Sequence, residues 1–366
     1  MQVPDKYWEK FKNHELPMRH RDKKENMPHA RAALAMCENI DWNVGRLLAK
    51  LDELDVAEDT IVCFFHDNGP NGSRWNGDMK GRKGSTDEGG VRSPLLVRWP
   101  NGISGGKRVT QIAAAIDLLP TLADLTGVNV QSEKPLDGVS LKPLLTQENA
   151  DWPERTIVSV WKQRLSLRTQ QYRLDYRGEL YDIAKDPGQR NPISDQPELV
   201  TKLKREAEAW RNELKPLDRN HNDTRPFMIG HPDYQCTQIP ARDGTAHGNI
   251  KRSNRYPNCS FFNNWKTTDD KITWEAEVPA DGTFEVELYY TCPVADVGST
   301  IELSYNDAKL SAKIAEAHDP TLVGAEQDRS PRTESYVKDF KPLKICLLYT
   351  SPSPRDQRGS RMPSSA

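Results

Sequence analysis

Two adjacent oxygen-bearing side chains and a basic loop give this sequence its chemistry. Asp67 and Asn68 follow the apolar run at residues 60–65, and their carboxylate and amide oxygens suit a hard cation such as calcium. The loop behind them would draw in an anionic substrate through Lys80, Arg82 and Lys83. Glycines at positions 81, 84, 89 and 90 let the backbone come close to a ligand. The pattern therefore indicates a cation-assisted site for an anion.

An α/β layout would hold these groups in one place. The run at 60–65 is β-favouring throughout, which is typical of a buried parallel strand, and residues 95–99 form a second apolar strand. Residues 30–54 repeat apolar side chains at helical spacing, so we expect a helix with one buried stripe. Another helix is expected at about 116–125, with Asp117 as a cap or surface group. In open α/β sheets ligands bind beyond the carboxyl ends of strands, where the Asp-Asn pair stands.

Three separate stretches of the sequence resemble one known family. They are residues 66–70 (HDNGP), residues 83–86 and 88–92 (KGST and EGGVR), and Pro94 with Trp99-Pro100. In this order and spacing they are similar to the formylglycine-dependent sulfatases of the alkaline phosphatase-like superfamily. The resemblance implies that Asp67 and Asn68 are two of the calcium ligands. It also implies that Lys83 binds the sulfate group of a sulfated small molecule or glycan.

The nucleophile of this family is a Cys or Ser oxidised to formylglycine within a Cys/Ser-x-Pro-x-Arg motif. None of the six cysteines has that context, and no serine does. The resemblance therefore implies that these residues correspond to the C-terminal part of a sulfatase, and we expect the polypeptide alone not to turn over sulfate esters. A signal peptide is not observable here, and the resemblance implies a periplasmic or secreted parent protein.

Each candidate side chain also has a simpler structural interpretation. Asp67 and Asn68 could form a polar turn that caps a strand, and Lys83 could be a solvated loop lysine. His66 could donate to substrate, although a histidine ending a buried strand is more often a hydrogen-bonded structural group. Lys80 fits a supporting or surface role. Arg92 follows Glu88 by four residues, so we expect an ion pair that orders the loop.

Composition limits the classes of protein that this chain can belong to. Its 366 residues give room for two or three domains. The net charge is −2, from 51 basic and 53 acidic residues, so no global field favours nucleic acid. No apolar stretch approaches the roughly 18 residues of a membrane span. Three cysteines, at 236, 259 and 292, could form one disulfide, and the sequence does not identify the pair. The oligomeric state also stays open.

The region after the predicted site divides into smaller parts. We expect residues 1–128 to form the catalytic portion and residues 129–220 to form an α+β subdomain. Short strands are expected in the subdomain at 155–160, 166–169 and 172–176, followed by a helix at about 196–214. In the family this subdomain packs on the catalytic sheet and lines part of the substrate cleft. Candidates for substrate contact within it are Trp161, Lys162 and Arg164.

Alternating strands predict a β-sandwich at residues 226–343. The strands at 272–278 and 283–290 are joined by a predicted hairpin turn at 280–282, and a further strand lies at 300–305. Aromatic residues that could stack on sugars or fill the core are Trp265, Trp274, Tyr289 and Tyr290. Residues 346–366 resemble a translated sequencing adapter, the alternative being a disordered tail, and we expect no strand partner there.

These observations predict a sulfuric ester hydrolase, arylsulfatase-like and acting on a carbohydrate, that depends on calcium and on formylglycine. One alternative is a phosphate or phosphonate monoester hydrolase of the same superfamily. A second alternative is a non-catalytic fragment that binds glycans through residues 226–343. The fold class expected is α/β, with a parallel sheet flanked by helices, a small α+β subdomain and an all-β accessory domain.

Overall fold

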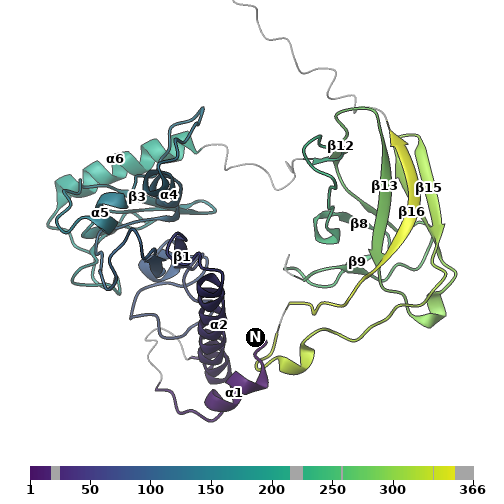
Figure 1. Cartoon of the computed structure of the whole chain (residues 1–366), viewed down its shortest axis with the longest axis horizontal. Coiled ribbons are helices and arrows are strands. Elements are labelled where there is room, and N and C mark those ends of the chain that lie inside the picture. The colour runs from purple at the N-terminus through teal and green to yellow at the C-terminus, as the bar shows by residue number, and fades with distance from the viewer. Residues whose placement is uncertain (18–24, 215–225, 257–258, 333, 351–366) are drawn as a thin grey trace, which may run out of the picture. The chain divides into compact units, whose positions relative to one another are not determined.

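The computed structural model describes residues 1–17, 25–214, 226–256, 259–332 and 334–350 (Figure 1). The chain forms two compact units. The first comprises Asp5–Arg219, and the second comprises Met1–Pro4 with Asn220–Ala366. They are called the 5–219 unit and the 220–366 unit below. The predicted boundary between residues 128 and 129 lies inside the first unit and stays a prediction.

Two helices open the 5–219 unit. Helix α1 (Asp5–Phe11) packs on the longer α2 (Met27–Glu53), whose first turn is capped by the side-chain oxygen of Asn26, which accepts from the backbone N–H of His29. The predicted helix at 30–54 is thus confirmed, but its predicted burial is wrong. Leu47 and Leu54 are 68% and 56% exposed, and the buried positions are alanines near the N-terminal end: Ala30, Ala32, Ala33 and Ala35. Periodicity shows that a face is apolar and does not show what covers it.

Strand β1 (Val62–Phe65) pairs with β2 (Leu95–Arg98), and the two run antiparallel, with Phe65 opposite Leu95. Both strands fall where the sequence predicts them. The expectation of a buried parallel strand is wrong for β1, because β2 is its one hydrogen-bonded neighbour within the described residues and its side chains are half-buried or exposed. Residues 66–94 therefore form a long loop whose two ends are held side by side, and this loop carries the candidate site.

Short helices follow the sheet pair. They are α3 (Glu88–Val91) inside the loop, the 3-10 turn η1 (Ala115–Asp117), α4 (Leu118–Thr126), which ends at Gly127, and α5 (Lys142–Thr146). Asp117 caps η1 as predicted, since its Oδ2 accepts from the backbone N–H of Ala114. It is not a surface group, because it is fully buried and its carboxylate also accepts from Arg155 and from the N–H of Val139.

A four-stranded antiparallel sheet completes the unit. Its strands, in spatial order, are β3 (Ile157–Trp161), β4 (Arg164–Arg168), β5 (Tyr172–Leu174) and β6 (Leu180–Asp182). Helix α6 (Pro197–Glu213) lies along this sheet (Figure 1), and Leu203 and Ala207 pack against buried leucines of the strands. The predicted strands and the apolar face of the predicted helix are confirmed. Together they make a rigid platform beside the loop.

The 220–366 unit consists of short strands and 3-10 turns. In chain order they are β7 (Phe227–Met228), η3 (Ala241–Asp243), β8 (Thr245–His247), β9 (Lys251–Arg252), β10 (Phe262–Asn263), β11 (Lys271–Thr273), β12 (Ala276–Glu277), β13 (Gly282–Tyr290), η4 (Val294–Asp296), β14 (Thr300–Tyr305), β15 (Ala308–Lys313), η5 (Ala325–Gln327) and β16 (Lys341–Thr350). Tyr290, Cys292 and Ile314 form a buried cluster, with Ile301 and Leu343 packed against it. The β-sandwich assignment stays a prediction.

Two local predictions for this unit are wrong. The strand at 272–278 is split into β11 and β12, which pair with β8 and β7, so the hairpin at 280–282 does not form. Strand β13 pairs instead with β16, whose residues 346–350 were expected to have no strand partner. An extended strand offers a full row of backbone donors and acceptors, and any β-favouring segment that reaches it can pair. The rest of the predicted tail, residues 351–366, lies outside the described residues.

Two further features concern membrane-spanning helices and cysteine cross-links. No helix in the described part of the chain is both long and apolar enough to cross a membrane. Cys236, Cys259 and Cys292 are free thiols, as are Cys37 and Cys63, so the disulfide that the sequence allowed among the first three is not formed.

Candidate functional site

The loop after β1 is folded back on itself by backbone hydrogen bonds. The N–H of Gly69 donates to the carbonyl of Gly90 (2.9 Å), and the N–H of Lys83 donates to the carbonyl of Pro70 (3.0 Å). A Cβ at residue 69 would lie 1.9 Å from the carbonyl oxygen of Gly89, so only glycine fits there. These contacts hold the backbone of Lys83 against Pro70, which lies two residues after Asn68 in the sequence.

Asp67 and Asn68 stand at the carboxyl end of β1, as predicted. Asp67 is exposed and Asn68 is half-buried. The Asn68 amide nitrogen donates to the carbonyl of Gly69 (2.8 Å), and this bond leaves the amide oxygen available as an acceptor. Within the described residues no cluster of three or more His, Cys, Asp or Glu could hold a metal ion. The pair fits a calcium site in its donor type but supplies two of the 6–8 oxygens that calcium takes.

The two loop lysines have different surroundings. The Lys80 ammonium lies 3.8 Å from Asp87 Oδ1, 3.9 Å from Asp175 Oδ2 and 5.0 Å from the centre of the Tyr181 ring. Lys83 is exposed, and its ammonium has no hydrogen-bond or ion-pair partner within the described ranges. Lys80 therefore braces the loop, in the supporting role expected for it, while the charge of Lys83 is free to meet an anion.

His66 is exposed at the end of the strand. Its backbone carbonyl accepts from the Ser93 hydroxyl (2.9 Å), and its ring lies edge-on to Phe64 with 5.4 Å between ring centres. Neither contact occupies a ring nitrogen. The bond from Ser93 holds the backbone of His66 at the end of β1. The substrate contact predicted for the His66 side chain stays a prediction.

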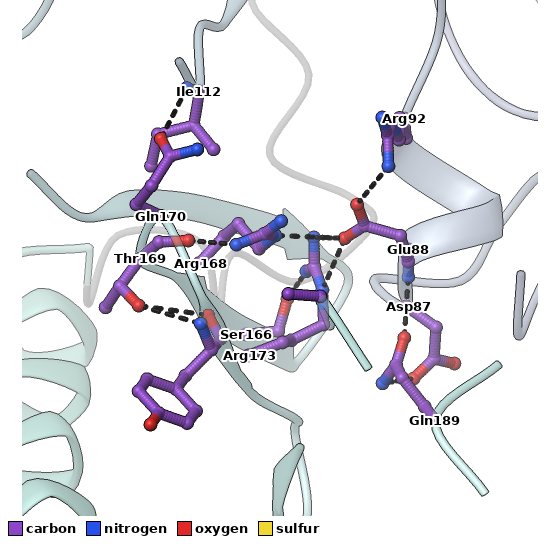
Figure 2. Close-up of polar contacts among 12 residues, drawn as sticks. Asp87, Glu88, Arg92, Ile112, Ser166, Arg168, Thr169, Gln170, Arg173 and Gln189 are labelled. Carbon is purple, nitrogen blue, oxygen red and sulfur yellow. Dashed lines mark hydrogen bonds and ion pairs between the residues drawn. The ribbon is translucent and has the colours of Figure 1, made fainter. Parts of the chain in front are cut away.

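A buried ionic cluster holds the far side of the loop in place (Figure 2). Glu88 is 3% exposed, and its Oε2 accepts from Arg173 through Nη2 (2.8 Å) and Nε (3.1 Å). The same oxygen accepts from Arg168 Nε (3.2 Å), and Oε1 accepts from Arg92 (3.4 Å). The predicted pair of Glu88 with Arg92 is therefore confirmed. The shorter contacts of Glu88 are with two arginines of β4 and β5, Arg168 and Arg173.

Further hydrogen bonds extend this cluster along the loop. Arg173 Nη1 donates to the carbonyl of Thr86 (2.8 Å), and the Ser166 hydroxyl donates to the same carbonyl (2.7 Å). Gln189 accepts from the N–H of Glu88 (2.8 Å) and donates to Asp87 (3.2 Å), as Figure 2 shows. Burial by itself would raise the pKa of Glu88, but the charges of Arg173 and Arg168 outweigh it and hold the pKa below its ordinary value.

Sequence patterns did not reveal Arg168, Arg173 and Gln189, which lie about 80 to 100 residues from their partners. Only Arg173 carried a local signal. It is a charged residue in a strand whose neighbours are buried, and a buried arginine needs a partner. The three residues connect the four-stranded sheet to the loop segment at 86–90. The sheet thereby positions the loop that carries Lys83.

Of the three candidates in the β3–β4 turn, Trp161 lies beside the loop. Its indole nitrogen is 3.6 Å from where a Cβ on Gly84 would stand, and Gly84 directly follows Lys83. The side chain is 49% exposed. Arg164 is paired in register with Trp161, and its guanidinium lies 5.0 Å from the ring centre of Tyr176. Lys162 is exposed at the turn with a φ of 56°.

Comparisons with known proteins agree with this arrangement of parts. The Sulfatase family model matches residues 1–128, and a model described as N-sulphoglucosamine sulphohydrolase, C-terminal, matches residues 83–213. Both models include the segment from Lys83 to the Gly89-Gly90 pair. The second model extends over the four-stranded sheet and α6.

Curated and solved relatives are similar over the same region. Steryl-sulfatase of Mus musculus is 44% identical over 118 residues, which are 30% of this chain and 19% of the relative. N-acetylglucosamine-6-O-sulfatase of Bacteroides thetaiotaomicron is 28% identical over 223 residues, covering 55% of this chain and 38% of the relative. The crystal structure of Ps i-CgsB is 27% identical with a TM-score of 0.50, covering 61% of this chain and 49% of that one.

The chain spans less than half the length of each of these three relatives. The two family models together run from residue 1 to residue 213, through the β1 strand, the glycine-rich loop and the four-stranded sheet. With its alkaline phosphatase-like α/β fold, this chain belongs to the sulfatase family.

Proposed function

We propose that this chain forms the sulfate-binding side, and part of the calcium-binding side, of a sulfuric ester hydrolase that acts on a sulfated carbohydrate. The observation that carries the proposal is the contrast between Lys83 and Lys80. The Lys83 ammonium is exposed, and the backbone N–H of Lys83 bonds to Pro70, two residues after Asn68, whereas the Lys80 ammonium is held by Asp87 and Asp175. A free point charge at this place suits an incoming sulfate.

Each residue has a role in this proposal. Asp67 and Asn68 would hold calcium through their side-chain oxygens, and a bound calcium would offset negative charge on the sulfate oxygens. Lys83 would stabilise the charge that develops as the S–O bond to the leaving group breaks. His66, next to Asp67, would donate a hydrogen bond to the substrate. The formylglycine motif does not occur in these 366 residues, so we do not expect this chain alone to hydrolyse sulfate esters.

A paired-substrate assay tests the proposal. The longest protein that contains this sequence would be assayed on p-nitrophenyl sulfate and p-nitrophenyl phosphate, with and without a calcium chelator, beside its Asp67→Ala variant. We expect calcium-dependent sulfate hydrolysis that Asp67→Ala lowers by about a hundredfold or more. A preference for the phosphate ester would favour the phosphate or phosphonate hydrolase alternative. Turnover of aryl sulfate by the purified 366-residue chain would contradict the role given to the missing motif.

Two exposed aromatic side chains favour a second role for the 220–366 unit. Trp265 and Tyr289 are 48% and 59% exposed, whereas Tyr290 is buried and donates its hydroxyl to the carbonyl of Glu316. Exposed aromatic faces can stack on sugars, so the unit would bind glycan and keep the enzyme at a polysaccharide outside the cytoplasm. Calorimetric titration of the full chain with neutral glycans, beside Trp265→Ala, would show this binding. No heat of binding would remove the idea.

A further inference from the structure

Next to Lys83 we propose a second anion subsite, a strip formed by Trp161, Arg164, Tyr176 and Arg177, which binds a polysaccharide that carries sulfate on neighbouring sugar units. This arginine–aromatic strip extends the proposed sulfate site, so the inference rests on the proposed function. It narrows the substrate class to a polysaccharide that carries several sulfate groups, in place of a small aryl sulfate.

One end of the strip touches the sulfate-binding loop. Trp161 ends β3, and its indole lies against Gly84, the residue after Lys83. Trp161 and Arg164 face each other in register across a tight turn, so Arg164 is paired with the residue that contacts the loop. A half-exposed indole against the backbone of the residue after Lys83 offers a flat apolar face for a sugar ring whose sulfate would reach Lys83.

The other end of the strip is held by cation–π contacts. The guanidinium of Arg164 lies 5.0 Å from the centre of the Tyr176 ring, and that of Arg177 lies 5.3 Å from it. Arg177 Nε also donates to the Tyr176 hydroxyl (2.9 Å). Two arginines are therefore held around one aromatic ring. A guanidinium held against an aromatic face loses less conformational freedom when it binds an anion.

These two arginines differ from the buried arginines nearby. Arg155, Arg168 and Arg173 are each paired with a carboxylate. Arg164 and Arg177 are exposed, and neither forms a salt bridge with a carboxylate in the described part of the chain. The terminal nitrogens of both guanidinium groups are left to donate to the oxygens of a sulfate group, which can accept two parallel hydrogen bonds.

Two carboxylates, Glu179 and Asp175, lie near the strip and keep their negative charges, and the Lys80 ammonium lies 3.9 Å from Asp175 Oδ2. Glu179 accepts from the Tyr181 hydroxyl (2.7 Å), and the buried Asp175 accepts through Oδ1 from the backbone N–H groups of Arg177 and Glu179. The net charge of the chain is only −2, so attraction for a polyanion must come from a local group of cations. Lys83, Arg164 and Arg177 supply three cations. Trp161 and Tyr176 supply the aromatic rings between which they are placed in the sequence of contacts from Gly84 to Arg177.

A binding titration with matched charge variants tests the inference. Fluorescence anisotropy would follow labelled dextran sulfate, unsulfated dextran and a single-stranded DNA oligonucleotide binding to the full chain. We expect Arg164→Gln/Arg177→Gln to weaken dextran sulfate binding about tenfold or more, and Trp161→Ala about fivefold. The double variant should also lower the salt dependence of log Kd, because fewer counterions are released. The control variant Arg205→Gln/Arg211→Gln removes two positive charges from α6 of the same unit. It should change dextran sulfate binding less than twofold.

The outcomes separate this inference from the proposed function. If the strip double variant binds dextran sulfate within twofold of the unaltered chain, the inference is wrong, even if Lys83→Ala weakens binding. If Lys83→Ala has no effect while the strip variants do, the strip stands and the proposed sulfate role of Lys83 fails. Tighter binding of DNA than of dextran sulfate through the same residues would overturn the assignment of a polysaccharide. Circular dichroism of each variant would confirm that the exposed substitutions leave the fold intact.

Discussion

At the scale of single residues, the surroundings of a charge decide whether it serves the fold or a ligand. Lys80 lies among Asp87, Asp175 and the Tyr181 ring, and Lys83, three residues later, is exposed. Both are lysines in one glycine-broken loop, so residue type alone does not separate them. The resemblance to sulfatases singled out Lys83, and the contacts of Lys80 give a physical reason for the choice.

This contrast predicts that the two lysines contribute unequally to stability. Lys80→Ala should lower the free energy of unfolding by about 1 kcal/mol, because two acidic groups lose a partly exposed cation. Lys83→Ala should leave the unfolding free energy within about 0.5 kcal/mol of the unaltered chain. Urea unfolding followed by circular dichroism measures both. An equal loss for the two variants would show that Lys83 also braces the loop.

At the scale of secondary-structure elements, the four-stranded sheet and the loop are joined through Glu88. Arg168 belongs to β4, Arg173 belongs to β5, and Glu88 begins α3, whose Gly90 carbonyl accepts from Gly69 next to Asn68. The sheet is thus connected to the end of β1 through the ion pairs of Glu88, the backbone of α3 and the Gly69–Gly90 hydrogen bond. Loss of the carboxylate should loosen the loop and leave two arginines buried without a counter-charge.

Glu88→Gln should therefore lower the unfolding free energy by about 3 kcal/mol at neutral pH. Arg92→Ala is the matched control, because its side chain is 60% exposed and its loss should cost less than about 1 kcal/mol. Chemical unfolding of the 5–219 unit, reported by its tryptophan fluorescence, compares the two. Equal losses would mean that the exposed pair, and not the buried one, holds the loop.

The same cluster predicts a pH dependence. The folded-state pKa of Glu88 is depressed, so its contribution to stability is complete above the unfolded-state value of roughly 4.3 and is lost as pH falls through the lower folded-state pKa. The difference in stability between the unaltered chain and Glu88→Gln should shrink as pH falls from about 5 toward 3. A difference that stays constant over this range would contradict the ionised state assigned to Glu88.

At the scale of the whole molecule, the first four residues of the chain belong to the same compact unit as its C-terminal part. Val3 is fully buried, its carbonyl accepts from Arg329 Nε and Nη2 (3.0 and 2.9 Å), and Gln2 donates to the carbonyls of Val323 and Gly324. These contacts place Met1–Pro4 within the 220–366 unit.

Val3→Ala should accordingly destabilise the 220–366 unit by about 1–3 kcal/mol, because a buried side chain is shortened. Amide hydrogen exchange should become faster at Val323–Arg329 and stay unchanged in α6. Val294→Ala is a matched control in the same unit, since Val294 is 81% exposed. Unchanged exchange at Val323–Arg329 in the Val3 variant would argue against this docking.

Local sequence patterns predicted those parts of the fold that depend on local residues. The helices α2, α4 and α6 and the strands β1–β5 all follow from local periodicity and β-favouring composition. What covers a surface was not predictable, as the exposed Leu47 and Leu54 of α2 show. Long-range pairing was also missed. The residues around Arg173 indicate that it needs a partner but do not identify Glu88, and no neighbouring residue predicts the pairing of β13 with β16.

The central claim, that the exposed ammonium at position 83 meets the sulfate group, is tested most directly by steady-state hydrolysis of p-nitrophenyl sulfate by the longest protein that contains this chain. Lys83→Ala and Lys80→Ala would be compared in the same assay. We predict that Lys83→Ala lowers kcat/KM by about a hundredfold or more, while Lys80→Ala changes it by less than about tenfold. A Lys83→Ala enzyme as active as the unaltered one would contradict the claim.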